Sequence, residues 1–172
     1  MPSPVSLLFE EQAAILSLLQ ANEPSFHATL ESTFPKVLLL AAASNFETRI
    51  CQHVLDFVSA NSSNGKVVAL VDSRVVKRSY HTWFEWDKLN ANGFWAFFGE
   101  DFRTRMKQLL KSDATLSESI KAFLELGRLR NHLVHKNYAL FTLEKTSEEI
   151  HHLYLQADLF VNSLPKLLDE TY

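Results

Sequence analysis

The sequence predicts an all-α fold, an antiparallel bundle with long core helices and one irregular, aromatic-rich insertion. Glycine and proline are scarce, with four and five residues in 172, so turns are few and the elements are long. Apolar residues recur at helical spacing over several long stretches. The length fits a single domain over residues 1–172, with a helix over about 4–21 as an appendage to a core over 25–168.

Helices account for the first part of the chain. Residues 4–21 carry an apolar stripe at helical spacing, and a second helical stretch begins near Ser25. Because proline disrupts a helix interior, Pro35 predicts a kink or a fresh start, from which a long helix runs over about 36–60. Residues 66–77 are rich in β-branched side chains, but their spacing favours a helix over a strand.

The second half contains one irregular stretch followed by three predicted helices. Residues 78–99 hold all three tryptophans, and such aromatic clusters indicate a core or a subunit interface more often than base stacking. A short helix is expected over 102–110. Capping boxes over 115–118 and 146–149 predict the starts of two long helices, joined by a connector over 138–143. Pro165 is expected to close the regular part of the last helix.

Composition narrows the class of protein. A net charge of −3 and a pI of about 6.2 argue against a broadly basic nucleic-acid coat, but they allow a local basic cleft. The single cysteine, Cys51, excludes an internal disulfide and a cysteine metal cluster, and its place on an apolar helix face predicts a core thiol. With no signal-peptide pattern and no membrane-length apolar run, we expect a cytoplasmic protein without membrane contact.

Two charged residues occupy apolar helix faces. At about 100° per residue, Arg130 lies at the centre of an arc that includes Phe123 and Leu126. A guanidinium keeps its charge, so Arg130 must meet a buried carboxylate, line a wet cleft or lie at an interface. Glu47 occupies the same place on the helix over 36–60. We therefore expect Glu47 and Arg130 to face one another, as a structural ion pair or within a functional site.

His135 favours a functional site. It follows Arg130 by five residues and points about 140° away on an ideal helix, so the two converge only if the helix frays or turns near Val134. Asn137 is a suitable helix stop. Arginine holds phosphate oxygens in a fork, and histidine transfers protons near neutral pH. Asn131, four residues before His135, is placed to orient the imidazole.

Other site types find less support. Glu148 and His152 have the spacing of a shared metal site, but no second ligand pair exists, so we expect no metal and no cofactor. His132 aligns with a polar helix face and is expected toward solvent, although a dimer cleft would still reach it. Seven basic residues form either solvated faces or a rim that steers an RNA backbone. These are Arg74, Lys77 and Arg78 in one group and Arg103, Arg105, Lys107 and Lys111 in the other.

The segment over 130–135, Arg-Asn-His-Leu-Val-His, resembles the R-x4-H motif of the HEPN superfamily, helical proteins that include many metal-independent RNases. Residues 44–47, which contain Glu47, resemble the acidic position on an early helix of that superfamily. Three further blocks, over 92–99, 127–131 and 143–150, resemble the RiboL-PSP type of HEPN domain. The resemblance extends over about residues 36–168 and implies an all-α HEPN bundle.

The resemblance also implies a function. It suggests a metal-independent endoribonuclease, a homodimer whose two motifs face one cleft and whose RNA provides the attacking 2′-OH. His135 would be general acid or base, Arg130 would stabilise phosphoryl charge, Asn131 would orient His135 or a phosphate, and Glu47 would hold Arg130. The family also suggests a defence or toxin–antitoxin setting with an antitoxin or other protein partner. Two alternatives stay open: a non-catalytic HEPN module that binds RNA, a nucleotide or a protein, and a structural helical adaptor.

Overall fold

The computed structural model describes residues 2–169, and over this range the chain is helical. An isolated bridge between Glu85 and Asn90 is the one β-type pairing among these residues, and no strand is formed. The predicted all-α class is therefore confirmed. Within residues 2–169, no helix combines the length and the apolar character needed to cross a membrane.

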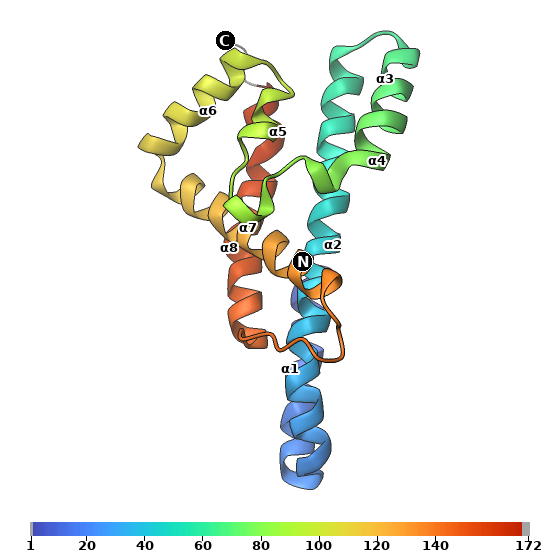
Figure 1. Ribbon diagram of the computed structural model, residues 1–172, viewed down its shortest axis with the longest axis vertical. Coiled ribbons are helices and arrows are strands. Elements are labelled where there is room, and N and C mark those ends of the chain that lie inside the picture. The colour runs from blue at the N-terminus through green and yellow to red at the C-terminus, as the bar shows by residue number, and fades with distance from the viewer. Residues whose placement is uncertain (1, 170–172) are drawn as a thin grey trace.

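The first two helices lie side by side as a long hairpin (Figure 1). They are α1, Pro4–Asn22, and α2, Pro24–Asn61. The predicted fresh start at Pro35 is wrong, because α2 continues through it as one helix. Proline removes one helical hydrogen bond, at a cost of about 3 kcal/mol. Burial of Pro35 itself and of Leu38 and Leu39 in the following turn offsets that cost.

The segment after α2 is helical, as its spacing predicted, but its geometry changes along the chain. It consists of α3, Gly65–Val71, a π-helical turn over Asp72–Val76, and α4, Lys77–Ser79. The wider π-helical turn closes with the Lys77 N–H donating to the Asp72 carbonyl, five residues back. A π-helical turn shifts the direction of the side chains that follow it, and such turns are frequent at functional sites.

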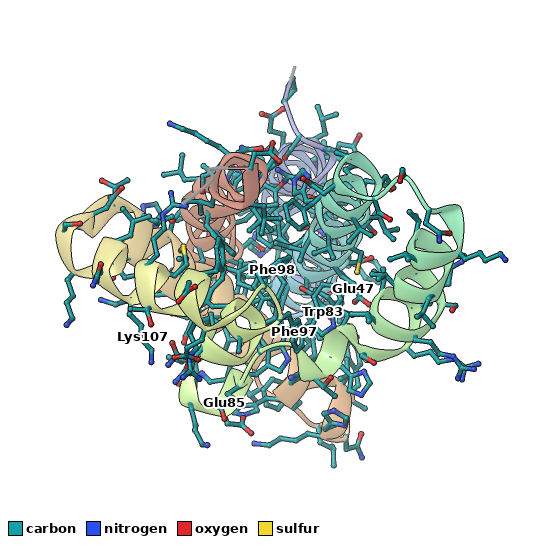
Figure 2. All side chains as sticks on the ribbon, turned by 90° about the horizontal axis from the view of Figure 1, so that it is seen from above. Glu47, Trp83, Glu85, Phe97, Phe98 and Lys107 are labelled. Carbon is teal, nitrogen blue, oxygen red and sulfur yellow. The ribbon has the colours of Figure 1, made fainter. Side chains whose placement is uncertain are left out.

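The aromatic stretch is irregular, as predicted, and most of its rings belong to the core. Two 3₁₀ turns, Tyr80–Thr82 and Trp86–Lys88, precede α5, Asn92–Ala96. Figure 2, a view from above, labels Trp83, Phe97 and Phe98 close together near the centre of the picture, and Trp83 and Phe97 are in edge-to-face contact. The ring of Phe97 is nevertheless 55% exposed. Five rings are buried: Trp83, Phe84, Trp86, Phe94 and Trp95.

The remaining helices are α6, Glu100–Ser112, α7, Ala114–His135, and α8, Ser147–Asp169. The capping box at α8 is confirmed, since the Thr146 N–H donates to Glu149 and the Glu149 N–H donates to the Thr146 hydroxyl. The capping box predicted over 115–118 for the start of α7 is wrong. Asp113, a stronger N-cap than threonine, starts that helix two residues earlier and accepts from the Leu116 N–H at 2.8 Å. The end predicted at Pro165 is also wrong, because α8 continues to Asp169.

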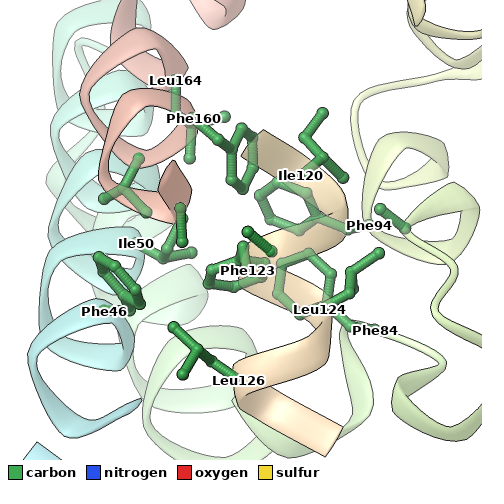
Figure 3. Close-up of a cluster of buried hydrophobic side chains, with 14 of the residues drawn as sticks. Phe46, Ile50, Phe84, Phe94, Ile120, Phe123, Leu124, Leu126, Phe160 and Leu164 are labelled. Atoms are coloured by element: carbon green, nitrogen blue, oxygen red, sulfur yellow. The ribbon is translucent and has the colours of Figure 1, made fainter. Parts of the chain in front are cut away.

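The hydrophobic core joins three long helices and the aromatic stretch (Figure 3). Phe46 and Ile50 enter it from α2, Phe123 from α7 and Phe160 from α8. Phe123 contacts Phe46, Phe160 and Phe84 with ring centroids 5.0–5.9 Å apart. This packing fixes α7 against α2 and so sets the distance between the helices that carry Glu47 and Arg130.

Candidate functional site

One cavity brings together the four residues predicted to be catalytic. It measures about 420 Å³ and lies between α2, the segment around α4, the Trp86 turn and the C-terminal half of α7. Glu47, Arg130, Asn131 and His135 all line it. A cavity of this size is in the usual range for small-ligand sites.

The C-terminal end of α7 provides three of these residues. Nη1 of Arg130 donates to Oδ1 of Asn131 at 3.1 Å, so Asn131 is paired with Arg130 and not with His135. His135 is the last residue of α7 and is exposed at the mouth of the cavity. The helix remains regular through Val134, and its C-cap is Lys136 instead of the predicted stop at Asn137, so fraying is not needed for His135 to reach the cavity.

Glu47 and Arg130 lie on the walls of the same cavity but do not pair. Both side chains are half-buried. Within residues 2–169, no hydrogen bond or ion pair joins their side chains, and the Glu47 carboxylate has no hydrogen-bond partner. Of the three environments considered for Arg130, the structure therefore shows a cleft instead of a buried ion pair. In Figure 2, Glu47 lies between α2 and the segment that contains α3 and α4.

The negative charge of Glu47 affects its two neighbours. Burial, with a further contribution from the Glu47 carboxylate, raises the pKa of Cys51 to about 11. Cys51 is half-buried on the edge of the core, not fully inside it as predicted. Burial also raises the pKa of Tyr80 well above its ordinary value; Glu47 and Cys51 add to this effect and Arg130 opposes it.

Sequence reasoning missed the residues that close the cavity from the aromatic stretch. These are Tyr80, His81 and Trp86, which follow the π-helical turn. The Tyr80 ring is held by Trp83 at 5.5 Å and by Phe84 and Trp86 at 6.1 Å. Because residues 78–91 have no regular period, no spacing argument indicated which of their side chains face α7.

Gly127 is a second residue whose role only the structure reveals. A β-carbon at this position would overlap the six-membered ring of Trp86, so the glycine allows the indole to lie directly on α7. The Trp86 Nε1–H donates to the His81 carbonyl at 3.0 Å, which holds the ring in place. An isolated glycine inside a predicted helix was the available signal for such a close approach.

The RiboL-PSP-HEPN family model matches residues 6–170. This chain belongs to the RiboL-PSP-HEPN family. The match confirms the resemblance found from the motif blocks and links the chain to a group of RNase-like and RNA-related domains. No curated protein and no solved structure shows a significant match to the chain.

The predicted basic groups of this HEPN domain divide between several surfaces. Lys77 and Arg78 line the cavity, and Lys77 also pairs with Asp72 at 2.6 Å. Arg74 instead borders a separate, mostly apolar cavity beside Trp83 and Phe97. Two predicted RNA contacts on α6 lie outside the motif cavity: Arg103, paired with Glu100 at 2.7 Å, and Arg105.

Two further histidine predictions can be located in the HEPN domain. His132 lies outside the cavity and its Nε2 is 3.4 Å from Oδ1 of Asp87 on the surface. This position agrees with the expected solvent-facing side of α7. His152 is exposed on α8, and across residues 2–169 no three His, Cys, Asp or Glu side chains gather as metal ligands would.

Proposed function

We propose that this HEPN domain is an endoribonuclease that cleaves RNA without a metal ion, using the RNA's own 2′-OH. The observation that carries the proposal is the charge of the motif cavity. Arg130, Lys77 and Arg78 line it together with two histidines, and Glu47 is the one carboxylate on its wall. Asp72 neutralises Lys77 from outside the cavity, which still leaves an excess of positive charge in a chain whose net charge is −3. Such a local excess of positive charge suits a phosphodiester.

In this mechanism the 2′-oxygen attacks the adjacent phosphorus as the bond from phosphorus to the 5′-oxygen breaks. A general base takes the 2′-OH proton, and a general acid gives a proton to the departing 5′-oxygen. The products are a 2′,3′-cyclic phosphate and a 5′-OH. His135 performs one of these proton transfers, and Arg130, held by Asn131, stabilises charge on the non-bridging oxygens. Lys77 and Arg78 bind flanking phosphates.

We further propose that the domain acts as a homodimer. His135 is exposed at the cavity mouth, and two proton transfers require two groups. A second copy that presents its own motif to the same cleft would add a second His135 to the two histidines, His81 and His135, that already line the cavity. A cytoplasmic defence or toxin–antitoxin role, with an antitoxin or other protein partner, is the setting that family membership suggests for such a nuclease.

The deciding experiment is RNA cleavage in EDTA by the wild type and by His135→Ala, with analysis of the product ends. We expect cyclic phosphate from the wild type and a loss of about 10²–10⁴-fold in the variant. His152→Ala is the matched control, because this exposed histidine on α8 lies outside the cavity. Cleavage that persists in His135→Ala, or that EDTA stops, contradicts the mechanism. RNA binding without cleavage would instead support the non-catalytic HEPN module.

A further inference from the structure

The unpaired carboxylate of Glu47 has no evident role in a site that binds phosphate alone. It is half-buried on the cavity wall, where it would repel a phosphodiester. Among residues 2–169 it accepts no hydrogen bond, so it does not hold Arg130. A partly buried charged group without a partner is costly. A ligand that brings hydrogen-bond donors to this position would remove that cost.

The cavity has two zones of different chemistry. Its inner wall contains buried apolar side chains, Phe46, Trp86, Phe123 and Leu126, which are at most 9% exposed. Its rim contains the exposed Lys77, Arg78, His81 and His135. An apolar, largely aromatic wall below a cationic rim matches a nucleotide, whose base is flat and whose phosphates are anionic. Glu47 lines the same cavity, close enough to Cys51 and Tyr80 for its charge to raise the pKa of both.

We propose that this cavity binds one unpaired guanine of single-stranded RNA, with the Glu47 carboxylate accepting hydrogen bonds from guanine N1–H and N2–H. This inference rests on the proposed function, since it names the substrate of the same site. Glu47 is thus a specificity-determining residue that contacts the base, in place of the anchoring role expected for it.

The choice of guanine follows from the hydrogen-bonding edges of the four bases. Guanine presents two donors on adjacent nitrogens, which suit the two oxygens of a carboxylate in a bidentate pair. In adenine and cytosine an amino donor stands beside a ring-nitrogen acceptor, and in uracil a single N–H stands between two carbonyls. Each of these edges would place an acceptor near Glu47. Because base pairing uses the same edge of guanine, the base must be unpaired.

Tyr80 is placed to complete the recognition. Its ring lines the cavity, and its pKa responds to the charges of both Glu47 and Arg130. A tyrosine phenol is protonated at neutral pH and burial raises the pKa of Tyr80 further, so its O–H is available as a hydrogen-bond donor. Guanine O6, a hydrogen-bond acceptor, lies beside N1. When N1–H donates to Glu47, the nearby Tyr80 O–H can therefore donate to O6.

The first test measures binding without chemistry. Calorimetry with 3′-GMP, 3′-AMP, 3′-CMP and 3′-UMP is expected to give at least tenfold tighter binding of 3′-GMP by the wild type. Glu47→Gln should abolish this preference, because its amide N–H would meet one of the guanine donors. Glu31→Gln, the same change on the exposed part of α2, should keep it. Tyr80→Phe should weaken 3′-GMP binding severalfold, which tests the site with a second variant.

The second test separates this inference from the nuclease proposal. Single-stranded oligonucleotides that differ at one base are incubated with the wild type and with Glu47→Gln, after melting curves establish that both are folded. We expect cleavage beside guanine in the wild type and a loss of that preference in the variant. Cleavage without base preference, or an equal loss at every base in Glu47→Gln, overturns the guanine site and leaves the nuclease intact. Guanine-selective binding without any cleavage supports the guanine site and overturns the nuclease.

Discussion

The indole of Trp86 lies on the backbone of Gly127, in the space that a β-carbon of any other residue would occupy. This contact joins the aromatic stretch to α7 within one wall of the motif cavity. The ring cannot move aside easily, because Nε1–H donates to the His81 carbonyl and Phe84 and Phe123 pack against it at 4.9 and 5.7 Å. The shape of the cavity therefore depends on the absence of a side chain at position 127.

Gly127→Ala is expected to destabilise the protein although alanine favours helices. Helix propensity gains about 1 kcal/mol, but overpacking against a fixed indole costs about 1–3 kcal/mol and displaces Trp86. Chemical denaturation followed by tryptophan fluorescence measures both effects. Gly65→Ala is the control, because no atom lies within 4 Å of a β-carbon there. Wild-type stability and fluorescence in Gly127→Ala would show that the Trp86 contact has no role.

Arg130→Lys is expected to slow RNA cleavage about 100-fold or more while leaving the fold intact. Lysine keeps the positive charge but lacks the planar fork that binds two phosphoryl oxygens. Single-turnover rates at saturating enzyme measure the effect, with Arg103→Lys as the control on α6 outside the cavity. If Arg130→Lys cleaves at the wild-type rate, the site needs only a charge, and the phosphoryl contact is not bidentate.

The thiol of Cys51 is expected to react slowly with iodoacetamide in the native protein. Only the thiolate reacts, and burial, aided by Glu47, raises the pKa of Cys51 to about 11. Glu47→Gln removes the smaller of these two effects, so the thiol should react severalfold faster while its pKa stays raised by burial. Mass spectrometry follows a single site, since Cys51 is the only cysteine. An unchanged rate in Glu47→Gln would mean that the carboxylate does not act on this thiol.

Stability is expected to fall as the pH decreases through about 6.5. Burial lowers the pKa of His151, with Glu10 opposing it, and burial aided by Arg49 lowers that of His53, with Asp56 opposing it. The unfolded chain therefore binds more protons than the folded chain between the unfolded and folded pKa values, and acid favours unfolding in that range.

His151 provides the variant for this prediction, because its ring stacks on Phe9 of α1 at 4.2 Å and contacts the Ser6 hydroxyl at 3.0 Å. Melting temperatures from pH 8 to pH 5 should depend less on pH in His151→Gln than in the wild type. His152→Gln, at the exposed neighbouring position, should keep the wild-type slope. A slope that His151→Gln leaves unchanged would assign the effect to His53 or to other groups.

Local sequence signals predicted the helices but not all of their ends. Apolar spacing identified every long helix, because a helix that packs on a core must repeat its apolar residues along one face. A fresh start of the helix at Pro35 and an end of the regular helix at Pro165 were wrongly expected. Each proline costs a hydrogen bond locally, yet buried neighbours such as Leu38 and Leu167 hold the chain helical on both sides. Tertiary burial, which no local signal contains, decided those two positions.

The residues of the candidate site also fall into two groups, those that the sequence indicates and those that only the structure reveals. Arg130, Asn131 and His135 could be proposed as site residues from the sequence alone, because they are close together in one motif on one helix, and all three line the motif cavity. Tyr80, His81 and Trp86 reach the cavity from an irregular stretch about fifty residues earlier. Their direction is set by a π-helical turn and by the close contact with Gly127, neither of which follows from spacing.

The relation between Glu47 and Arg130 shows most clearly which features of the site the sequence alone cannot determine. The sequence alone determined that each charge lies on the inner face of a long helix, because the wheel position of a residue depends only on its own helix. The distance between the two charges depends on how far α7 stands from α2. The ring of Phe123 and the insertion of the aromatic stretch set that separation. Tertiary packing thus placed the two charges on the walls of one cavity and decided against the ion pair, one of the two arrangements that the sequence left open.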